Sequence, residues 1–336
     1  MKTFQIIAAL LLGSTMANVD AQSPSIYKIA NKIHLPGDGK WDYLYSDDAA
    51  SRLYVSHGTM VQVVDETNGN LIGTVAGLNG VHGIAIDAEL NKGYITSGKD
   101  TAVTVFDTQT FAVLKRITVS GLNPDAVLFD PFSKKVFAFN GKSNNATVID
   151  VATDAIVATI PFTGNPEFSV TDGSGKVYVN LESASSIAVI NTSTLKVENV
   201  WPLTPGEEPT GLALDYQTHR LFSACANKLM LVVNAENGNV ITSLPIGDRV
   251  DGAAFDPELK RAYSSNGEGS VTVIQEERNN SFKVLETIQT QKGAKTITVN
   301  KKTHHVYTAV ANFEDSTSAK PKIATGTFAV LDIVAQ

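Results

Sequence analysis

The sequence is poor in cysteine and shows no sustained helical periodicity, and both absences narrow what the chain can be. Its single cysteine, Cys225, excludes an intrachain disulfide, so packing must hold the fold together. Cys225 lies in the apolar segment "LFSACA" without an obvious histidine partner, and we expect a buried hydrophobe rather than a catalytic thiol. A glycine-rich phosphate loop, a Gly-x-Ser-x-Gly elbow and a dinucleotide fingerprint are also missing, so no standard catalytic motif assigns a chemistry.

The composition is that of a folded, acidic protein. Hydrophobic residues make up 43% of the 336 residues and charged residues 18%, which excludes wholesale disorder. The formal net charge of -7 repels phosphate backbones on average, so nucleic acid is a disfavoured partner. The length allows two ordinary domains or one large all-β domain.

The N-terminus has the layout of a secretory signal. A positive charge at Lys2 is followed by a short apolar run from Phe4 to Leu12 and by the small-residue motif "VDA" before Gln22. We therefore expect residues 1–21 to be a signal peptide that is cut after Ala21, and the protein to be secreted or periplasmic. The apolar run is too short for a bilayer-spanning helix, and we expect no membrane span.

The rest of the chain is an internal repeat. An aromatic residue opens a short strand every 40 to 44 residues, and an Asp or Asn stands about seven residues before it, at the end of an apolar run such as "GIAID" or "GLALD". This spacing is typical of four-stranded propeller blades. The aromatic residues are Tyr54, Tyr94, Phe137, Tyr178, Phe222, Tyr263 and Tyr307, and the capping residues are Asp47, Asp87, Asp130, Asp172, Asp215, Asp256 and Asn300.

Each repeat reads as four strands whose apolar runs are nearly continuous, as expected for sheets buried on both faces. The seventh unit ends after its third strand, and the segment from Tyr27 to Gly37 resembles the missing outer strand. We therefore predict that residues 22–336 form one all-β domain, a seven-bladed β-propeller with four antiparallel strands per blade. The N-terminal strand would close the ring and remove the free edges. We expect a monomer.

Repeats such as "SRLYVSHGTMVQVVDETNGNLIGTV" and "KVYVNLESASSIAVINTSTLKVENV" resemble the YVTN-type β-propeller repeats of YncE-like exported bacterial proteins. The resemblance covers the whole chain after the signal and implies the propeller fold and an exported location. It implies little about activity, because function depends on sites that differ among proteins of one fold. The family includes proteins without an assigned chemistry and some nucleic-acid binders, and it neighbours propeller lactonases and lyases.

Alignment of the units places mainly charged side chains at the start of the innermost strands. These residues should form a ring, called the mouth ring below, at one end of the central channel: Asp42, His82, Asp125, Glu167, Thr210, Asp251 and Lys295. Crowded carboxylates raise one another's pKa or recruit a cation, so the ring suits a ligand, a divalent ion such as calcium or an acid–base pair. A wet channel mouth would also need polar residues without any function.

Loops on the same face supply further candidates, although they also fit ordinary hairpin turns. They are His57, Lys99, Asn140, Lys142, Glu182, Asn266, Glu314 and Asp315. The last two belong to an unusually long loop, from Asn312 to Thr325, for which a lid role is a hypothesis. On the opposite face we expect His304 and His305 to be solvated.

The pattern thus favours a binding module that presents the mouth ring to a small ligand or a protein partner. An alternative is a hydrolase, lactonase or lyase at the channel mouth, with or without a divalent cation. A second alternative, nucleic-acid binding, depends on the family resemblance only.

Overall fold

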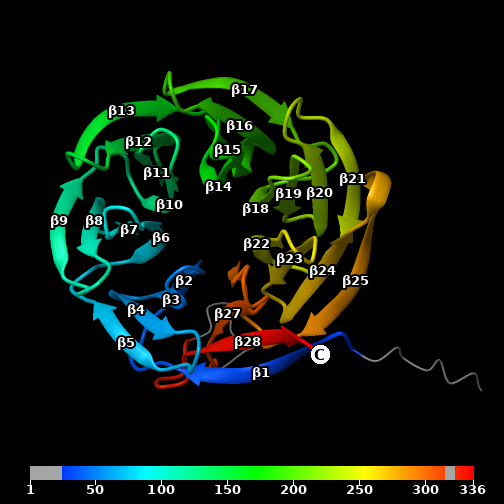
Figure 1. The fold of residues 1–336 in the computed structure, drawn as a ribbon, viewed down its shortest axis with the longest axis horizontal. Helices are drawn as coiled ribbons and strands as arrows, with labels where there is room; N and C mark the ends of the chain where they lie inside the picture. Colours follow the sequence, from blue (N-terminus) through cyan, green and yellow to red (C-terminus); the bar gives the residue numbers. More distant parts are fainter. Residues whose placement is uncertain (1–24, 315–321) are drawn as a thin grey trace, which may run out of the picture.

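The computed structural model describes residues 25–314 and 322–336. These residues form seven four-stranded antiparallel sheets arranged as blades around a central axis (Figure 1). The predicted seven-bladed β-propeller is therefore confirmed. The predicted signal peptide, residues 1–21, lies outside the described residues.

Six blades use four consecutive strands each, with the first strand next to the axis and the fourth on the outside (Figure 1). Their strands are, for blade 1, β2 (Trp41–Asp47), β3 (Arg52–His57), β4 (Met60–Asp65) and β5 (Leu71–Val75); for blade 2, β6 (Val81–Asp87), β7 (Lys92–Ser97), β8 (Ala102–Asp107) and β9 (Val113–Thr118); for blade 3, β10 (Pro124–Asp130), β11 (Lys135–Asn140), β12 (Asn145–Asp150) and β13 (Ala155–Pro161); for blade 4, β14 (Pro166–Thr171), β15 (Lys176–Leu181), β16 (Ser186–Asn191) and β17 (Lys196–Pro202); for blade 5, β18 (Pro209–Asp215), β19 (Arg220–Cys225), β20 (Leu229–Asn234) and β21 (Val240–Pro245); and for blade 6, β22 (Val250–Asp256), β23 (Arg261–Asn266), β24 (Ser270–Glu276) and β25 (Phe282–Gln289).

The seventh blade joins both ends of the chain. It consists of β26 (Ile297–Val299), β27 (Val306–Val310), β28 (Ala329–Ala335) and, as its outer strand, β1 (Tyr27–His34). β1 pairs antiparallel with β28 from Tyr27↔Ala335 to His34↔Ala329. The Glu286 carboxylate of β25 accepts hydrogen bonds from the backbone N–H groups of Ile26 (2.9 Å) and Tyr27 (3.2 Å) and so also ties the strand to blade 6. The predicted closure by the N-terminal strand is confirmed.

Helical structure in the described part of the chain is limited to two single-turn 3₁₀ segments, Glu182–Ala184 and Arg278–Asn280. Among the same residues, no helix combines the length and the hydrophobicity that crossing a membrane requires.

The core lies between adjacent blades, which explains the continuous apolar runs. In one such layer, Tyr54 and Val63 of blade 1 pack with Ile84, Ile95 and Phe106 of blade 2. All seven repeated aromatics are at most 2% exposed. The capping residues form hydrogen bonds with the turn that follows their strand. For example, the Asp87 carboxylate accepts hydrogen bonds from the backbone N–H groups of Glu89 (3.1 Å) and Leu90 (3.3 Å). Cys225 is fully buried, as predicted.

The prediction that His304 and His305 are simply solvated is wrong. The Nδ1 of His304 lies 2.7 Å from a carboxylate oxygen of Asp256, which is fully buried in blade 6. The Nδ1 of His305 lies 2.8 Å from Asp332 on β28. Both partners come from other strands, so the turn sequence alone could not show these contacts.

Candidate functional site

The mouth ring is positioned by strand register. Six of its residues are the second residue of an innermost strand, and the seventh, Lys295, precedes β26 by two residues. In β2, β6 and β10 the first residue is buried and the second is half-buried, because successive side chains of a strand point to opposite faces. This alternation turns the polar side chains toward the channel.

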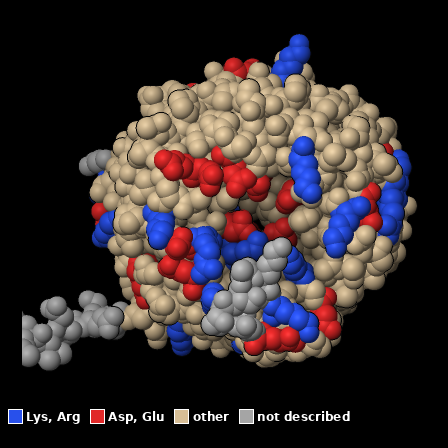
Figure 2. Space-filling model, turned by 180° about the vertical axis from the view of Figure 1, so that it is seen from behind, with Lys and Arg blue, Asp and Glu red and all other residues tan. Residues whose placement is uncertain are grey.

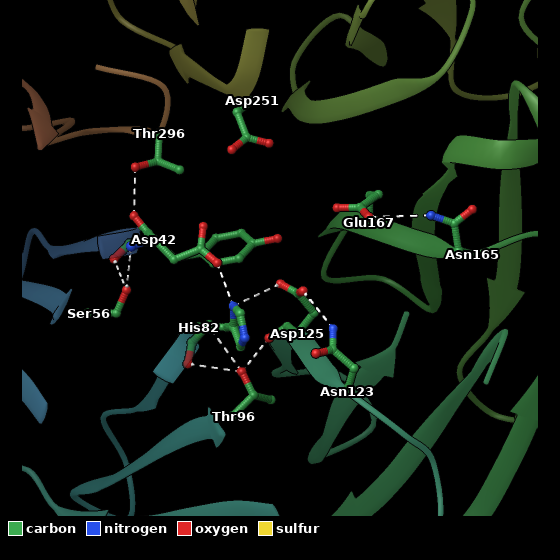
Figure 3. A network of polar contacts seen from close by, with 12 residues as sticks. Asp42, Ser56, His82, Thr96, Asn123, Asp125, Asn165, Glu167, Asp251 and Thr296 are labelled. Carbon is green, nitrogen blue, oxygen red and sulfur yellow. Dashed lines mark hydrogen bonds and ion pairs between the residues drawn. The ribbon is translucent and has the colours of Figure 1, made fainter. Parts of the chain in front are cut away.

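His82 lies between two carboxylates. Its Nδ1 is 2.6 Å from Oδ2 of Asp42 and 3.7 Å from Oδ1 of Asp125, and Figure 3 shows the imidazole between the two. Ligand atoms of these three side chains all lie within 4.8 Å of one another. Two carboxylates and one imidazole at this spacing could hold a divalent cation, and the imidazole nitrogen favours a transition metal over calcium, which prefers oxygen ligands.

A glycine keeps the other edge of the imidazole clear. A Cβ atom at Gly98 would lie 2.9 Å from Nε2 of His82 and 2.8 Å from the Asn123 side chain. Any larger residue at position 98 would displace the imidazole of His82. The Asn123 amide also donates a hydrogen bond to Asp125 (3.2 Å), which orients that carboxylate (Figure 3).

Hydroxyl groups of neighbouring strands fix the backbone of the ring. Thr296 donates to the Asp42 carbonyl (2.6 Å), and Ser265 donates to the Lys295 carbonyl (2.6 Å). Thr210, itself predicted as a ring residue, donates to the Val250 carbonyl of the next blade (3.1 Å). Its hydroxyl therefore joins blades 5 and 6 and holds the residue that precedes Asp251.

The side of the mouth ring away from His82 is mainly acidic. Burial raises the pKa of Glu167 to about 9, and the carboxylates of Asp125 and Glu182 add to the effect. Burial also raises the pKa of Asp251 to about 6, although the Lys295 ammonium, which is bonded to it, opposes the rise. These carboxylates thus crowd one another in a partly dehydrated space, as the sequence predicts.

The same forces act on the histidine side. Burial, followed by the negative charge of Asp42, raises the pKa of Asp125 to about 6. Burial lowers the pKa of His82, but the hydrogen bond to Asp42 and the charge of Asp125 outweigh it, and the net shift is upward. His82 therefore favours its protonated form more than an isolated imidazole does.

Two aromatic side chains narrow the channel beneath the mouth ring. Tyr43 of blade 1 and Phe168 of blade 4 come from nearly opposite sides of the axis, and their ring centroids are 5.4 Å apart. They follow Asp42 and Glu167 directly in the sequence. The two side chains therefore form an aromatic constriction of the channel.

A cavity of about 840 Å³, called the mouth cavity below, opens beside the histidine. Its polar wall includes Asp42, His82, Lys295 and the predicted loop residues Lys99 and Lys142. Further lining residues are Asp38, Lys40, Trp41, Thr59, Asn79, Val81, Asn123, Phe313, Ile323 and four glycines. Figure 2 shows the mouth, with acidic side chains mainly above the central opening and basic ones mainly below it.

Three predicted loop residues are placed away from the mouth cavity. His57, Asn140 and Asn266 end the second strands of blades 1, 3 and 6, and all three are fully buried. The Nδ1 of His57 is 3.0 Å from the Gln62 side chain, and its ring stacks on Phe328 at a centroid distance of 3.9 Å. These three side chains therefore stabilise the blades and do not face a ligand in the mouth cavity.

The Asn140 amide donates to Asn145 (2.7 Å) and Thr147 (3.0 Å) of its own blade. The Asn266 amide binds Ser270 (3.0 Å) and Thr272 (3.1 Å) in the same way. The shared pattern shows that this asparagine position shapes the hairpin.

The remaining loop candidates lie at the rim. The Glu182 carboxylate accepts a hydrogen bond from Asn165, which also approaches Glu167 at 3.5 Å. Glu314 pairs with Lys322 (3.0 Å) where the two described ends of the long loop run antiparallel. Asp315 lies outside the described residues. Because residues 315–321 are not described, the lid role stays a prediction.

Sequence reasoning missed the residues that give the mouth cavity its character. Lys40 and Trp41 stand directly before Asp42, and Phe313 packs against Trp41 with centroids 6.4 Å apart. The sequence did contain a signal for the aromatic constriction. In most units the residue after the mouth-ring residue is small, whereas blades 1 and 4 have Tyr43 and Phe168 there.

Comparisons with known proteins show the fold and no more. No family model and no curated protein matches the chain. Among solved structures, hydrazine synthase of Kuenenia stuttgartiensis is similar over 90% of this chain and 98% of that chain, with 17% identity and a TM-score of 0.73. U3-55K (10% identity, TM-score 0.74, 90% and 98% covered) and the RRP9 WD40 repeats (10%, 0.73, 90% and 97%) are similar too. The YVTN-type resemblance stays a prediction.

Proposed function

We propose that this protein is an exported binding module that holds a small ligand in the mouth cavity. The observation that carries the proposal is the cavity itself. It has about 840 Å³ of space, lies within the usual range for small-molecule sites, and brings Asp42, His82 and Lys295 together with the aromatic Trp41 and Phe313. The export part of the proposal depends on the signal-like sequence of residues 1–21.

The site has the two components that a specific pocket needs. Apolar side chains supply contact area, and a few oriented polar groups fix the ligand's position. His82 is held by Asp42, and Asp42 is in turn held through its backbone by Thr296, so this polar group is preorganised rather than mobile. The enzymatic alternatives stay predictions.

A screen with a blocked cavity tests the proposal. Thr59 is exposed and lines the cavity, so Thr59→Trp should fill it, whereas Thr303→Trp adds the same bulk to an exposed turn on the opposite face. We would screen neutral, anionic and cationic fragments by ligand-observed NMR. Fragments that bind the wild type should bind Thr303→Trp equally and lose binding to Thr59→Trp. An empty screen, or hits that ignore Thr59→Trp, would contradict the proposal.

A second candidate function, binding of a divalent transition metal, is favoured by the cluster of Asp42, His82 and Asp125 within 4.8 Å. Imidazole and carboxylate groups are common ligands of zinc and cobalt. The three side chains would leave further coordination positions for water or a ligand in the adjoining cavity. Cobalt(II) absorption, measured with wild type and with His82→Gln, tests this directly.

A further inference from the structure

Three lysines meet at the mouth cavity without forming an ion pair in the described protein. Lys40, Lys99 and Lys142 all line it and are exposed, and none of them forms an ion pair with another described residue. By contrast, Lys92, Lys134 and Lys135 elsewhere in blades 2 and 3 are each paired with a carboxylate. In a chain of net charge -7, three unpaired lysines at one cavity are available to an anionic ligand.

One buried hydrogen-bond donor beside the cavity lacks a partner. Trp41 is only 8% exposed, and its indole Nε1 is buried without an acceptor among residues 25–314 and 322–336. A buried indole N–H usually has a partner, and leaving it unpaired is unfavourable. Lysine ammonium groups are donors only, so the three exposed lysines can each donate to an acceptor on a ligand.

The apolar part of the wall is mainly aromatic. Trp41 packs against Phe313 and Phe328 at centroid distances of 6.4 and 5.6 Å, and Val81 and Ile323 complete this side of the cavity. Both carboxylates of this wall already have a partner. Asp42 is engaged with His82, and Asp38 accepts a hydrogen bond from the Gly326 backbone (3.2 Å). A ligand for this wall should therefore bring acceptors and a planar apolar group.

We propose that the mouth cavity binds a small organic anion, a carboxylate or a phosphate ester that carries a planar apolar group. The anionic group lies between Lys99 and Lys142, with Lys40 close by, and the planar group lies against Trp41 and Phe313. This inference depends on the proposed function, because it names the ligand class of the same cavity.

Four small probes that share a phenyl group separate the effect of ligand charge from that of the aromatic group. Benzoate and phenyl phosphate carry the two candidate anions, benzamide is neutral, and benzylamine is cationic at neutral pH. We expect the anions to bind more tightly than benzamide and benzylamine to bind least, as measured by calorimetry or ligand-observed NMR. The ratio between benzoate and phenyl phosphate identifies which anion the cavity prefers. Binding of the anions should weaken with added salt, whereas benzamide binding should not.

Lysine variants test whether the anionic group binds between Lys99 and Lys142. Lys99→Met and Lys142→Met keep the side-chain length and remove the charge, and each should weaken anion binding by about twofold to fivefold. The matched control is Lys302→Met, since Lys302 is exposed in the turn between β26 and β27 on the opposite face. It should bind all four probes as the wild type does, and benzamide binding should not change in any of the three variants.

The outcomes separate this inference from the proposed function. If all four probes bind with equal affinity and Thr59→Trp abolishes their binding, the cavity is a ligand site but the anion inference is wrong. If the anions bind but Lys99→Met and Lys142→Met match Lys302→Met, the anion lies elsewhere and the inference is overturned. If none of the probes binds while other fragments bind the cavity, the ligand class is again refuted and the proposed function stands.

Discussion

Replacing Glu167 with glutamine should stabilise the protein at neutral pH. Burial and neighbouring carboxylates raise the pKa of Glu167 from 4.5 to about 9 in the folded state. A carboxyl group whose pKa is raised by folding contributes fully below pH 4.5, and its contribution is lost progressively as the pH rises to about 9. Glutamine keeps the shape of the protonated acid and has no charge to lose.

The size of the effect follows from linkage. Between the two pKa values, the wild type loses about 1.4 kcal/mol of unfolding free energy per pH unit relative to the variant. At pH 7 this amounts to at most about 3.5 kcal/mol. Because water reaches part of the half-buried side chain, we expect about 1–3 kcal/mol in favour of Glu167→Gln. Near pH 4 the two proteins should have equal stability.

Urea unfolding at pH 4, 5, 6, 7 and 8 measures this difference without adding salt. Glu207→Gln is the matched control, because Glu207 is exposed in the loop that precedes β18 on the same face. We expect that control to follow the wild type within about 0.5 kcal/mol at every pH. A Glu167→Gln advantage that does not grow between pH 5 and pH 8, or that the control shares, would refute the idea that carboxylate crowding strains the mouth.

Three further outcomes are expected. Deleting residues 22–35 removes β1 and leaves β28 as a free edge, so soluble monomer should disappear in size-exclusion chromatography; a monomer with an unchanged melting temperature would contradict ring closure. Burial raises the pKa of the Cys225 thiol to about 12, so this thiol should resist a thiol reagent until the protein unfolds, and Cys225→Ser should lose about 1–3 kcal/mol of stability; rapid labelling of the native protein would refute this. If Asp42, His82 and Asp125 hold a transition metal, zinc or cobalt should raise the melting temperature of the wild type, by an amount equivalent to about 2.7 kcal/mol at a hundredfold excess over Kd, and should not affect Asp125→Asn.

The fold could be predicted because the repeat carries it. A buried aromatic and a capping Asp or Asn recur in every blade, and each serves the same local purpose, so their spacing reports the architecture directly. The outer-strand character of the segment from Tyr27 likewise predicted closure, since only one blade lacked a strand. The register of the innermost strands placed Asp42, His82 and Asp125 together for the same reason.

The candidate site was less predictable because its contacts join distant segments. Tyr43 meets Phe168 across the channel, and no local pattern links residues in blades 1 and 4. His57 and Asn266 have the appearance of polar loop residues, but their side chains bond inward to their own hairpins. Polarity in a turn therefore did not distinguish a group that faces a ligand from one that braces the backbone.

Part of the charge asymmetry of the mouth, in contrast, comes from one repeated loop position. The second residue after the second strand of each blade is exposed in blades 2, 3 and 6, where it is Lys99, Lys142 and Glu268 respectively. In blades 1 and 4 the same position holds the uncharged Thr59 and Ser183. The strands and their caps fix the backbone here, so the side chain can vary without affecting the fold. Substitutions at this position can therefore change the charge at the rim of the mouth without affecting the strands, which is why ligand preference should respond to Lys99 and Lys142 while stability should not.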